Sequence, residues 1–369
     1  MQVLSNTTGM LAAVMVSTDK DAYDYCVVVV KGTFVTSPSG ALTLAQEQRP
    51  FVYADEHYSH PETSAIRYES DFAPIKPLTD VVVVGKAVAP HGQAVKSLSV
   101  RLEVNDRVKE LTVFGDRQWK RSWGRIIASE PRPFCEMPLT FDRAFGGIDD
   151  SQGPGRCDAE RHNLVGVGYH RHRRGSDLVG MPLPNLEYPR QPISEPSDLV
   201  SPAGLGFVGR AWQPRIDRAG TYDSRWRAQV CPLLPTDFDD RYFQSAPDDQ
   251  QFALFRGGEL IRCVHMSSEP VVMYTVPTIQ IPITFQFIDH EVTQQVTLDT
   301  VILEPHEKLA ILLWRTRVRI GRKPSALRWI SVGPKPAQDR IIGYRNGKPI
   351  FTGLADAIRW LRRPEDSGS

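Results

Sequence analysis

The hydrophobic pattern near the amino terminus predicts β-strands. Residues 25–34 (YCVVVVKGTF) and 80–88 (DVVVVGKAV) are runs of β-branched side chains, which favour extended backbone. Gly85 interrupts the second run, where a bulge or a close backbone approach is expected. Both runs therefore predict strands in the first part of the chain.

A β-hairpin is predicted by the alternation that follows. Every second side chain is apolar over residues 97–104, and residues 108–113 resume the apolar pattern from Val108 after the turn-forming pair Asn105-Asp106. Alternation of this kind gives a strand one buried and one solvated face. It predicts an antiparallel sheet and not alternating strands and helices.

The strand pattern returns after residue 251. Apolar and polar side chains alternate over residues 279–287, and Pro282 assigns this strand to a sheet edge or a bulge because proline cannot donate a ladder hydrogen bond. Residues 292–303 and 309–314, joined by a Glu-Pro-His-Glu turn, predict a second hairpin. Two shorter apolar stretches predict further strands, at residues 318–320 and 327–332.

One helix is predicted, near the carboxyl end. Leu354, Ile358 and Leu361 form an apolar stripe along residues 355–363, and Pro364 ends the pattern. Together the patterns predict a mainly β fold with antiparallel sheets, arranged as a sandwich or an open barrel. Long ordered loops rich in proline, glycine and aromatic residues are expected to connect the strands.

Changes in composition divide the 369 residues into four regions. The length suits two domains, or one large β body with insertions. The regions are residues 1–130 (β-rich), 131–251 (glycine, proline and aromatic loops), 252–335 (antiparallel β) and 336–369 (a tail with the short helix).

The stretch from Trp212 to Gln251 is predicted to be an ordered loop that organises the rest of the chain. It shows neither helical nor strand periodicity, and its prolines and glycine are suited to fix the backbone by turns. We expect it to act first as a scaffold and only second as a contact surface. The aromatic side chains that we expect it to bury are Trp212, Tyr222, Trp226, Tyr242 and Phe243.

Two chemistries fit the aspartates of this stretch. Asp237, Asp239 and Asp249 supply oxygen atoms suited to a hard cation, although their spacing does not match a calcium-binding loop. The alternative is that the aspartates cap turns and pair with nearby arginines such as Arg215 and Arg241. We favour turn chemistry and expect no bound metal.

The most basic run of the chain comprises His170 and His172 with Arg171, Arg173 and Arg174. Such a run can meet a phosphate, but it lacks the aromatic side chains on which a single strand of nucleic acid stacks. We expect a solvated loop, because short charge runs are usually exposed faces.

Composition narrows the functional classes. Lys and Arg number 44 against 43 Asp and Glu, so no overall field attracts nucleic acid or an anionic membrane. The 5 cysteines never form a C-x-x-C pair, which indicates reduced thiols. The apolar run at residues 10–16 has no basic residue before it, and no stretch approaches the ~20 apolar residues of a bilayer helix. These observations predict a cytoplasmic protein.

Familiar catalytic and cofactor motifs do not occur in the sequence. It contains no G-x-S-x-G elbow, no P-loop and no G-x-G-x-x-G after a strand. A site assembled from distant residues is not addressed by this search, because such sites are recognised by geometry.

Eight short sequence blocks follow one another in order along the chain. The blocks are D-V-V-V-V-G from Asp80, F-G-D-R-x-W from Phe114, P-L-x-F-D-R-A-F-G-G from Pro138, P-L-P-N-L-E from Pro182, W-Q-P-R from Trp212, G-T-Y-D-x-x-W from Gly220, P-x-L-P-x-D-F-D from Pro232 and R-Y-F-x-x-A-P-x-D-Q from Arg241. Together they resemble a bacterial domain-of-unknown-function family that is encoded in type VI secretion effector loci. The chain departs from the family pattern at residues 163–168, which read N-L-V-G-V-G in place of N-P-x-G-x-G.

The resemblance implies an effector adaptor or chaperone that is not an enzyme and needs no cofactor. Its implied partners are a toxin effector and the secreted spike, VgrG or a PAAR tip, with no nucleic acid and no membrane. The candidate partner-binding or scaffold residues are Trp212, Arg215, Tyr222, Asp223, Trp226, Asp237, Asp239, Arg241, Tyr242, Phe243 and Gln250.

Two other classes of function stay open at this point. A metal-assisted hydrolase would use Asp237, Asp239 and Asp249. A structural component of the secreted particle or a β-type glycan-binding module would be exported or would bind a glycan through an exposed Trp212 or Trp226.

Overall fold

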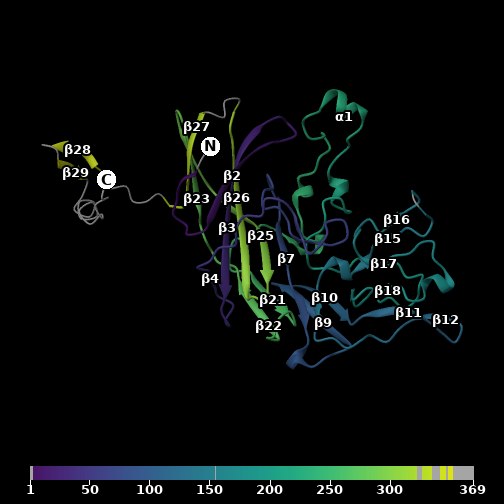
Figure 1. Ribbon diagram of the computed structural model, residues 1–369. Coiled ribbons are helices and arrows are strands. Elements are labelled where there is room, and N and C mark those ends of the chain that lie inside the picture. Colours follow the sequence, from purple (N-terminus) through teal and green to yellow (C-terminus); the bar gives the residue numbers. More distant parts are fainter. Residues whose placement is uncertain (1–2, 154, 322–325, 335–340, 346–347, 352–369) are drawn as a thin grey trace, which may run out of the picture.

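The protein is built mainly of β-strands, as the sequence predicts (Figure 1). Within the described part of the chain, no helix is long and apolar enough to cross a membrane. The computed structural model describes residues 3–153, 155–321, 326–334, 341–345 and 348–351.

Strands from both ends of the chain form the largest sheet. Its members are β2 (Leu11–Thr18), β3 (Asp24–Thr36), β4 (Leu42–Leu44), β7 (Thr79–Val83), β20 (Gln251–Phe252), β25 (Thr297–Glu304) and β26 (Leu309–Arg319). The order is β2-β3-β26-β25-β7-β20, and β4 pairs with β3. All neighbours are antiparallel except β7 and β25. The predicted hairpin around the Glu-Pro-His-Glu turn is confirmed as β25 and β26.

The valine run of β3 is buried because this sheet is covered on both faces. Val28 and Val30 belong to the main hydrophobic cluster, whereas Val27 and Val29 belong to a second cluster. Successive side chains of a strand point to opposite faces, so the four valines divide between two cores. A continuous apolar run is the pattern expected of such a strand.

A four-stranded sheet contributes to the main cluster and corrects one prediction. It consists of β1 (Val3–Asn6), β27 (Leu327–Val332), β23 (Pro282–Phe287) and β24 (Glu291–Gln295), in that order. The strand with Pro282 lies between β27 and β24, so the edge alternative is wrong, whereas the ladder with β27 does shift register between Gln286 and Phe287, away from the proline. Proline is tolerated because it is the first residue of the strand, and the ladder with β27 begins one residue later at Ile283.

A five-stranded sheet contains the predicted amino-terminal hairpin. Its order is β19 (Leu186–Glu187), β10 (Arg107–Phe114), β9 (Ser97–Val104), β21 (Leu260–Val264) and β22 (Val271–Thr275). Strands β9 and β10 pair directly across the Asn105-Asp106 turn, where Asn105 has a positive φ of 52°. Asparagine tolerates this conformation better than most residues, which suits it to a tight turn.

The hydrophobicity of Val108 suggests that its side chain faces the core, but the structure shows it facing solvent. Val108 is 60% exposed, and Lys109 is buried in its place, on the same face of β10 as Leu111 and Val113. Burial lowers the pKa of Lys109, and the carboxylate of Asp249 opposes this effect. The reason for burying a lysine is its pair of acceptors, Asp249 and Gln250, at 2.7 and 2.8 Å.

Two predicted strands are each divided between different sheets. The run 80–88 breaks at Gly85, because β7 remains in the large sheet while β8 (Lys86–Val88) pairs with β13 (Glu136–Pro138). The run 292–303 breaks at Val296, between β24 and β25. In both cases the hydrophobic run continues while the chain changes its hydrogen-bonding partner.

The remaining elements are short. Two-residue to six-residue strands form small ladders: β5 (Glu56–His57) with β6 (Ile66–Tyr68), β11 (Arg117–Ser122) with β12 (Arg125–Ala128) and β18 (Pro182–Leu183), β14 (Phe145–Gly146) with β17 (Val167–Gly168), β15 (Ile148–Asp149) with β16 (Asp158–Ala159), and β28 (Ile341–Arg345) with β29 (Lys348–Phe351). Helical segments are α1 (Ser224–Gln229) and the 3-10 turns η1 (Pro90–Gly92), η2 (Phe141–Arg143), η3 (Gly175–Leu178), η4 (Ile216–Arg218), η5 (Asp240–Phe243) and η6 (Asp248–Gln250). The helix predicted at 355–363 lies outside the described residues.

Loops cover the second face of the large sheet. Phe207 and Ala246 join Val27, Val82 and Ile302 in the second hydrophobic cluster. Ala246 belongs to the stretch from Trp212 to Gln251, which the sequence analysis predicts to be an ordered loop. The loops therefore complete a core that the strands alone leave open.

A buried carboxylate holds this stretch against the sheet. Asp80, on β7, is fully buried. Its side chain accepts hydrogen bonds from the Nζ of Lys76 at 2.7 Å, the Nε2 of Gln244 at 2.7 Å and the backbone N–H of Ser245 at 2.8 Å. Lys76 also donates to the hydroxyl of Ser245 and Gln244 to the carbonyl of Leu78, so the carboxylate of Asp80 is the acceptor that all three donors share in a buried network.

Replacing Asp80 therefore tests the attachment of the stretch. Asp80→Ala leaves Lys76 buried without its carboxylate, and loss of one partner of a buried ion pair typically costs about 3 to 5 kcal/mol. We expect a loss of this size in the free energy of unfolding, measured by urea denaturation. Asp106→Ala, in the exposed β9–β10 turn, is the matched control; equal losses for both variants would contradict the role of Asp80.

Candidate functional site

Part of the stretch from Trp212 to Gln251 is buried against the sheets, and we call this part, which includes Trp212, Arg215 and Gln250, the base. Trp212 is only 6% exposed and packs edge-to-face on Phe141, with ring centroids 5.4 Å apart. Arg215 is buried in an ion pair with Glu69 and also donates to two backbone carbonyls. Gln250 donates to the carbonyl of Val81 at 2.6 Å. These residues have the contacts of a scaffold.

Aromatic side chains next to the base form a cluster in which Phe238 is buried and Tyr242 and Phe243 are half-buried. The rings of Phe238, Tyr242 and Phe243 lie 5.4 to 5.8 Å apart in tilted and edge-to-face pairs. Asp239 begins the 3-10 turn η5 by accepting a hydrogen bond from the backbone N–H of Arg241. The side chain of Arg241 pairs with the same carboxylate. The predicted pairing of an aspartate with a nearby arginine is thus present here.

Residues 221–234, which we call the arm, differ from the prediction of a buried loop. They contain the helix α1, and Figure 1 shows it at the end of a loop that extends away from the sheets. Tyr222 is 52% exposed and is therefore not part of a core. A helix of six residues is too short to produce a recognisable period of 3.6, which is why the pattern did not reveal it. The detectable signal is Asp223 at the N-cap position just before the helix, because aspartate is a residue type that favours helix starts.

The arm is held in shape by its own contacts. Asp223 caps α1 by accepting from the backbone N–H of Trp226 at 2.7 Å. The indole N–H of Trp226 donates to the carbonyl of Leu233 at 2.9 Å, and its ring meets Tyr222 edge-to-face at 4.6 Å. At the foot of the arm, Asp237 accepts from both the N–H and the hydroxyl of Thr221. The exposed ring of Tyr222 and the half-buried ring of Trp226 are thus held in a defined position.

A groove of about 290 Å³ lies between the foot of the arm and the turn that joins β2 to β3, and we call it the arm groove. The Nζ of Lys20, in that turn, donates to the carbonyl of Phe238 at 3.4 Å. Lys20, Asp240 and Arg317 add charge to its lining. Its apolar lining residues are Tyr25, Ile75, Leu234, Phe238 and Phe243.

The aspartates proposed as metal ligands have separate partners. Asp237 binds Thr221, and these hydrogen bonds lower its pKa. Asp239 binds Arg241, and Asp249 binds Lys109. Within the residues that the structure describes, no group of three or more His, Cys, Asp or Glu side chains is placed to hold a metal ion. The geometry thus favours turn chemistry for these carboxylates.

Acidic residues surround the basic run at 170–174. The buried carboxylate of Asp149 accepts from the backbone N–H groups of Arg171 and His172, at 2.7 and 2.8 Å. Burial by itself would raise the pKa of Asp149, but hydrogen bonds from Ser151, His172 and Arg171 outweigh burial and hold it well below its usual range. His172 also contacts Asp158, at 2.5 Å. Aspartates therefore neutralise part of the run, since Arg171 lies near Asp158 and Arg173 pairs with Asp149 and Asp150.

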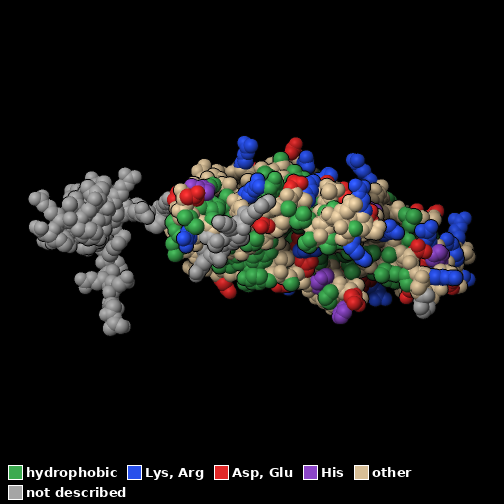
Figure 2. Space-filling model, turned by 90° about the horizontal axis from the view of Figure 1, so that it is seen from above, with side chains coloured by type: hydrophobic (Ala, Val, Ile, Leu, Met, Phe, Trp, Pro, Cys, Tyr) green, Lys and Arg blue, Asp and Glu red, His purple; other side chains and the backbone are tan. Residues whose placement is uncertain are grey.

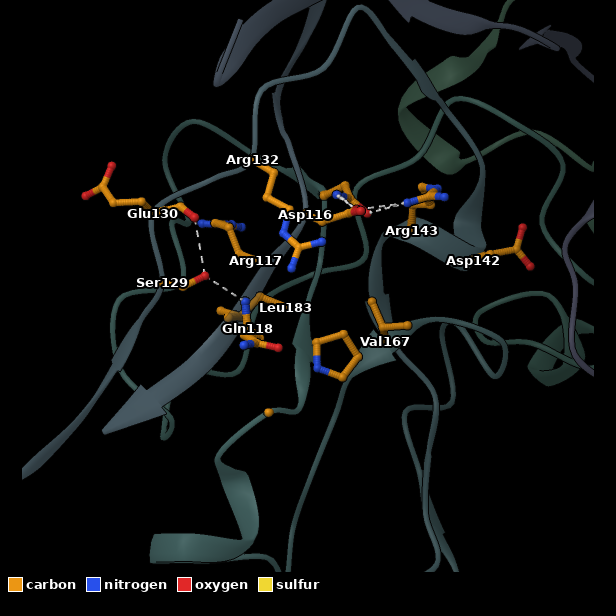
Figure 3. Close-up of a pocket in the computed structure, with 13 residues that line it drawn as sticks. Asp116, Arg117, Gln118, Ser129, Glu130, Arg132, Asp142, Arg143, Val167 and Leu183 are labelled. Carbon is orange, nitrogen blue, oxygen red and sulfur yellow. Dashed lines mark hydrogen bonds and ion pairs between the residues drawn. The ribbon is translucent and has the colours of Figure 1, made fainter. Parts of the chain in front are cut away.

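Three of the sequence blocks meet at a polar cleft of about 620 Å³, which we call the motif cleft (Figure 3). The sequence pattern did not bring these blocks together, because they lie on different strands and loops. The block that starts at Phe114 contributes Asp116 and Arg117, and the block that starts at Pro138 contributes Asp142 and Arg143. The block that starts at Pro182 contributes Leu183 and Asn185.

Hydrogen bonds between side chains join the three blocks. Asn185 donates to Asp116 at 3.1 Å and accepts from Arg143 at 3.1 Å. Arg143 also reaches Asp116, at 3.3 Å. Arg117 is buried against Glu187 and lies over the ring of Phe114. One wall of the cleft is therefore a connected network of polar side chains.

The loop in which the chain departs from the family pattern supports the same cleft. Asn163 is fully buried and donates to the carbonyls of Phe141 and Phe145, at 2.8 and 3.1 Å. A side chain on Gly166 would come within 2.6 Å of the carbonyl oxygen of Ala144, so glycine is required there. The loop therefore keeps a close backbone contact with the block that starts at Pro138.

Replacing Trp212 and Tyr222 separates the base from the arm. Trp212→Ala removes a large buried ring, which typically costs about 3 to 5 kcal/mol. Tyr222→Ala removes an exposed ring that packs mainly on its own arm, so a cost of about 1 kcal/mol or less is expected. Chemical denaturation of both purified variants measures the difference. A large loss of stability in Tyr222→Ala would show that the arm belongs to the core.

Metal removal tests the aspartate assignment. A metal ion bound only by the native state would raise the melting temperature, and a chelator would then lower it. We expect thermal unfolding curves with and without EDTA to superimpose, because Asp237, Asp239 and Asp249 already have protein partners. A clear drop in melting temperature with EDTA would support the metal alternative.

Comparison with known proteins identifies the family. No curated protein and no solved structure matches the chain. A family model described as an uncharacterized protein conserved in bacteria, DUF2169, matches residues 21–315 and thus includes the base, the arm and the motif cleft. The chain belongs to this bacterial family, DUF2169.

Proposed function

We propose that the protein is a non-enzymatic adaptor that binds a toxin effector of a type VI secretion system and assists its loading onto the spike. The effector and the spike proteins, VgrG or a PAAR tip, come from the resemblance of the eight sequence blocks. Membership of DUF2169 is compatible with this role and does not by itself name it.

The aromatic pair on the arm, in which Tyr222 is exposed and Trp226 is half-buried, is the observation that carries the binding part of the proposal. Trp and Tyr are enriched among residues that dominate protein interfaces, since each buries a large area with few torsions to immobilise. Tyr222 and Trp226 are held by a capped helix and by the contact with Leu233. Little conformational entropy is then lost when a partner covers them.

The arm groove offers a second contact on the same side of the stretch. Its apolar residues, including Leu234 and Phe243, form a depression suited to an anchor side chain of a partner. Lys20, Asp240 and Arg317 provide charges of both signs at its margin. Such a combination of apolar centre and polar rim is the usual composition of a protein interface.

Surface charge agrees with protein binding more than with nucleic-acid binding. Figure 2 shows acidic and basic side chains interspersed over one face of the molecule. The formal net charge is +1. A nucleic-acid interface normally gathers basic side chains on one surface.

The hydrolase and glycan-binding alternatives receive less support. A metal-assisted hydrolase would need Asp237, Asp239 and Asp249 at one ion, and each has a different partner. A glycan site on Trp212 is disfavoured because this ring is buried. Trp226 remains a candidate for that role, and glycan-array binding would distinguish it from the adaptor.

The arm is tested by measuring effector affinity and stability together. The protein is coexpressed with the candidate effector encoded beside it, and affinity is then measured by titration calorimetry with the purified components. Tyr222→Ala and Trp226→Ala are expected to weaken binding by about 2 kcal/mol each, the size of an interface hot spot, with little change in melting temperature.

Trp123→Ala is the control, because Trp123 is fully exposed in the β11–β12 turn, away from the arm (Figure 1). Unchanged affinity in both arm variants would refute the arm as the binding surface. Absence of any complex with the candidate effector would count against the adaptor function itself.

A further inference from the structure

We propose that the motif cleft is a binding site for a carboxylate group of an extended acidic peptide, with Arg132 as its main contact. The site lies on the β11–β18 ladder and its neighbouring loops, whereas the arm groove lies beside the β2–β3 turn. The inference does not depend on the adaptor function, because it concerns other residues and another ligand chemistry.

The backbone of Arg132 is fixed before any ligand arrives. Pro131 and Pro133 flank it, and proline restricts both its own φ and the conformation of the residue before it. The N–H of Arg132 donates to the carbonyl of Asp116 at 3.1 Å. Its own carbonyl oxygen packs so tightly on Gly115 that a Cβ there would come within 1.7 Å of it. A guanidinium on such a backbone loses little backbone freedom on binding.

The side chain of Arg132 has no partner among the residues that the structure describes. In Figure 3 its guanidinium points toward the middle of the cleft, between Asp116 and Leu183. The Arg117 guanidinium, by contrast, is paired with Glu187, and Arg143 is shared by Asp116 and Asn185. Arg132 therefore supplies the uncompensated positive charge of the cleft.

The carboxylates around the cleft are turned away from it or already paired. Figure 3 shows the side chains of Glu130 and Asp142 pointing outward. Glu130 pairs with Lys96, and Asp142 accepts from the backbone N–H of Ala65. Asp116 is held by Arg143 and Asn185, as described above. An incoming anion thus meets the guanidinium of Arg132 at the centre, beside an Asp116 carboxylate that is already hydrogen-bonded, while Glu130 and Asp142 lie at the margin.

This charge arrangement favours a carboxylate over a phosphate. A guanidinium matches the planar geometry of a carboxylate through two parallel hydrogen bonds. A phosphate would bring nearly two negative charges into a cleft that contains one unpaired arginine and three acidic residues at its margin. The second charge would therefore face repulsion with no additional partner.

The rest of the cleft suits a peptide. The amide of Gln118 is exposed and has no partner in the described structure, so it can bind a peptide group. Val167, Pro182 and Leu183 add an apolar surface. A volume of about 620 Å³ lies within the usual range for ligand sites and accommodates more than one carboxylate.

The test uses the full chain and a short fluorescein-labelled peptide of alternating glutamate and serine residues. Fluorescence anisotropy in low salt should show binding that is lost when glutamine replaces glutamate in the peptide. Arg132→Ala should weaken binding by about tenfold or more, because hydrogen bonds between charged groups are stronger than those between neutral groups. Its melting temperature should stay unchanged because the side chain contacts nothing that it stabilises.

Arg121→Ala is the matched control. Arg121 is exposed on β11, outside the cleft, and the change removes the same charge. It should alter affinity by less than about twofold, as expected for a distant screened charge. Equal weakening by both variants would mean nonspecific attraction and would overturn the proposal.

Further binding measurements with other ligands define which chemical group the cleft recognises. A serine-glycine peptide with a free carboxyl terminus and its amidated form show whether a terminal carboxylate or a side-chain carboxylate is preferred. Inorganic phosphate should compete more weakly than the glutamate peptide. Stronger competition by phosphate, or no peptide binding at concentrations up to about 1 mM, the range of weak complexes, would refute a carboxylate-peptide site.

Discussion

The attachment of the loops to the large sheet depends on one buried carboxylate, Asp80. It lies on β7, beside the valines that build both hydrophobic clusters, and it binds Lys76, Gln244 and Ser245. Hydrophobic contact alone does not fix the register of an irregular segment, because apolar contacts are not directional. Hydrogen bonds to a single buried acceptor do fix it, since any shift leaves a donor unpaired.

The second anchor works in the same way from another sheet. Lys109 on β10 binds Asp249 and Gln250, and Gln250 in turn binds the carbonyls of Val81 and Leu205. The stretch is thus held at two points, one in each of two sheets. Its base closes the core while the arm between Thr221 and Leu234 stays outside. A rigid base with a projecting arm allows scaffold and contact surface to occur in one segment.

Much of the fold was predictable because it follows from side-chain periodicity. The valine run of β3, the β9–β10 hairpin and the β25–β26 hairpin appear where the pattern places them. The errors have local physical causes. Val108 is exposed because Lys109 must face inward to its acceptors, and Pro282 lies in a central strand because it occupies the first position. Helix α1 depends on one cap and six residues, too few for a periodic signal.

The sequence by itself determined where the long strands lie and, through the ordered blocks, that the chain resembles a bacterial family of unknown function. It also identified most of the residues of the base, because aromatic and proline-rich loops are rarely left without packing. Only the tertiary structure decided that Tyr222 is exposed while Trp212 is buried, and that Arg117, Arg143 and Asn185 line one cleft with Arg132. The physical reason is that periodicity reports the environment of a strand or helix face, whereas exposure in loops and contacts between distant blocks depend on how the sheets and loops pack together.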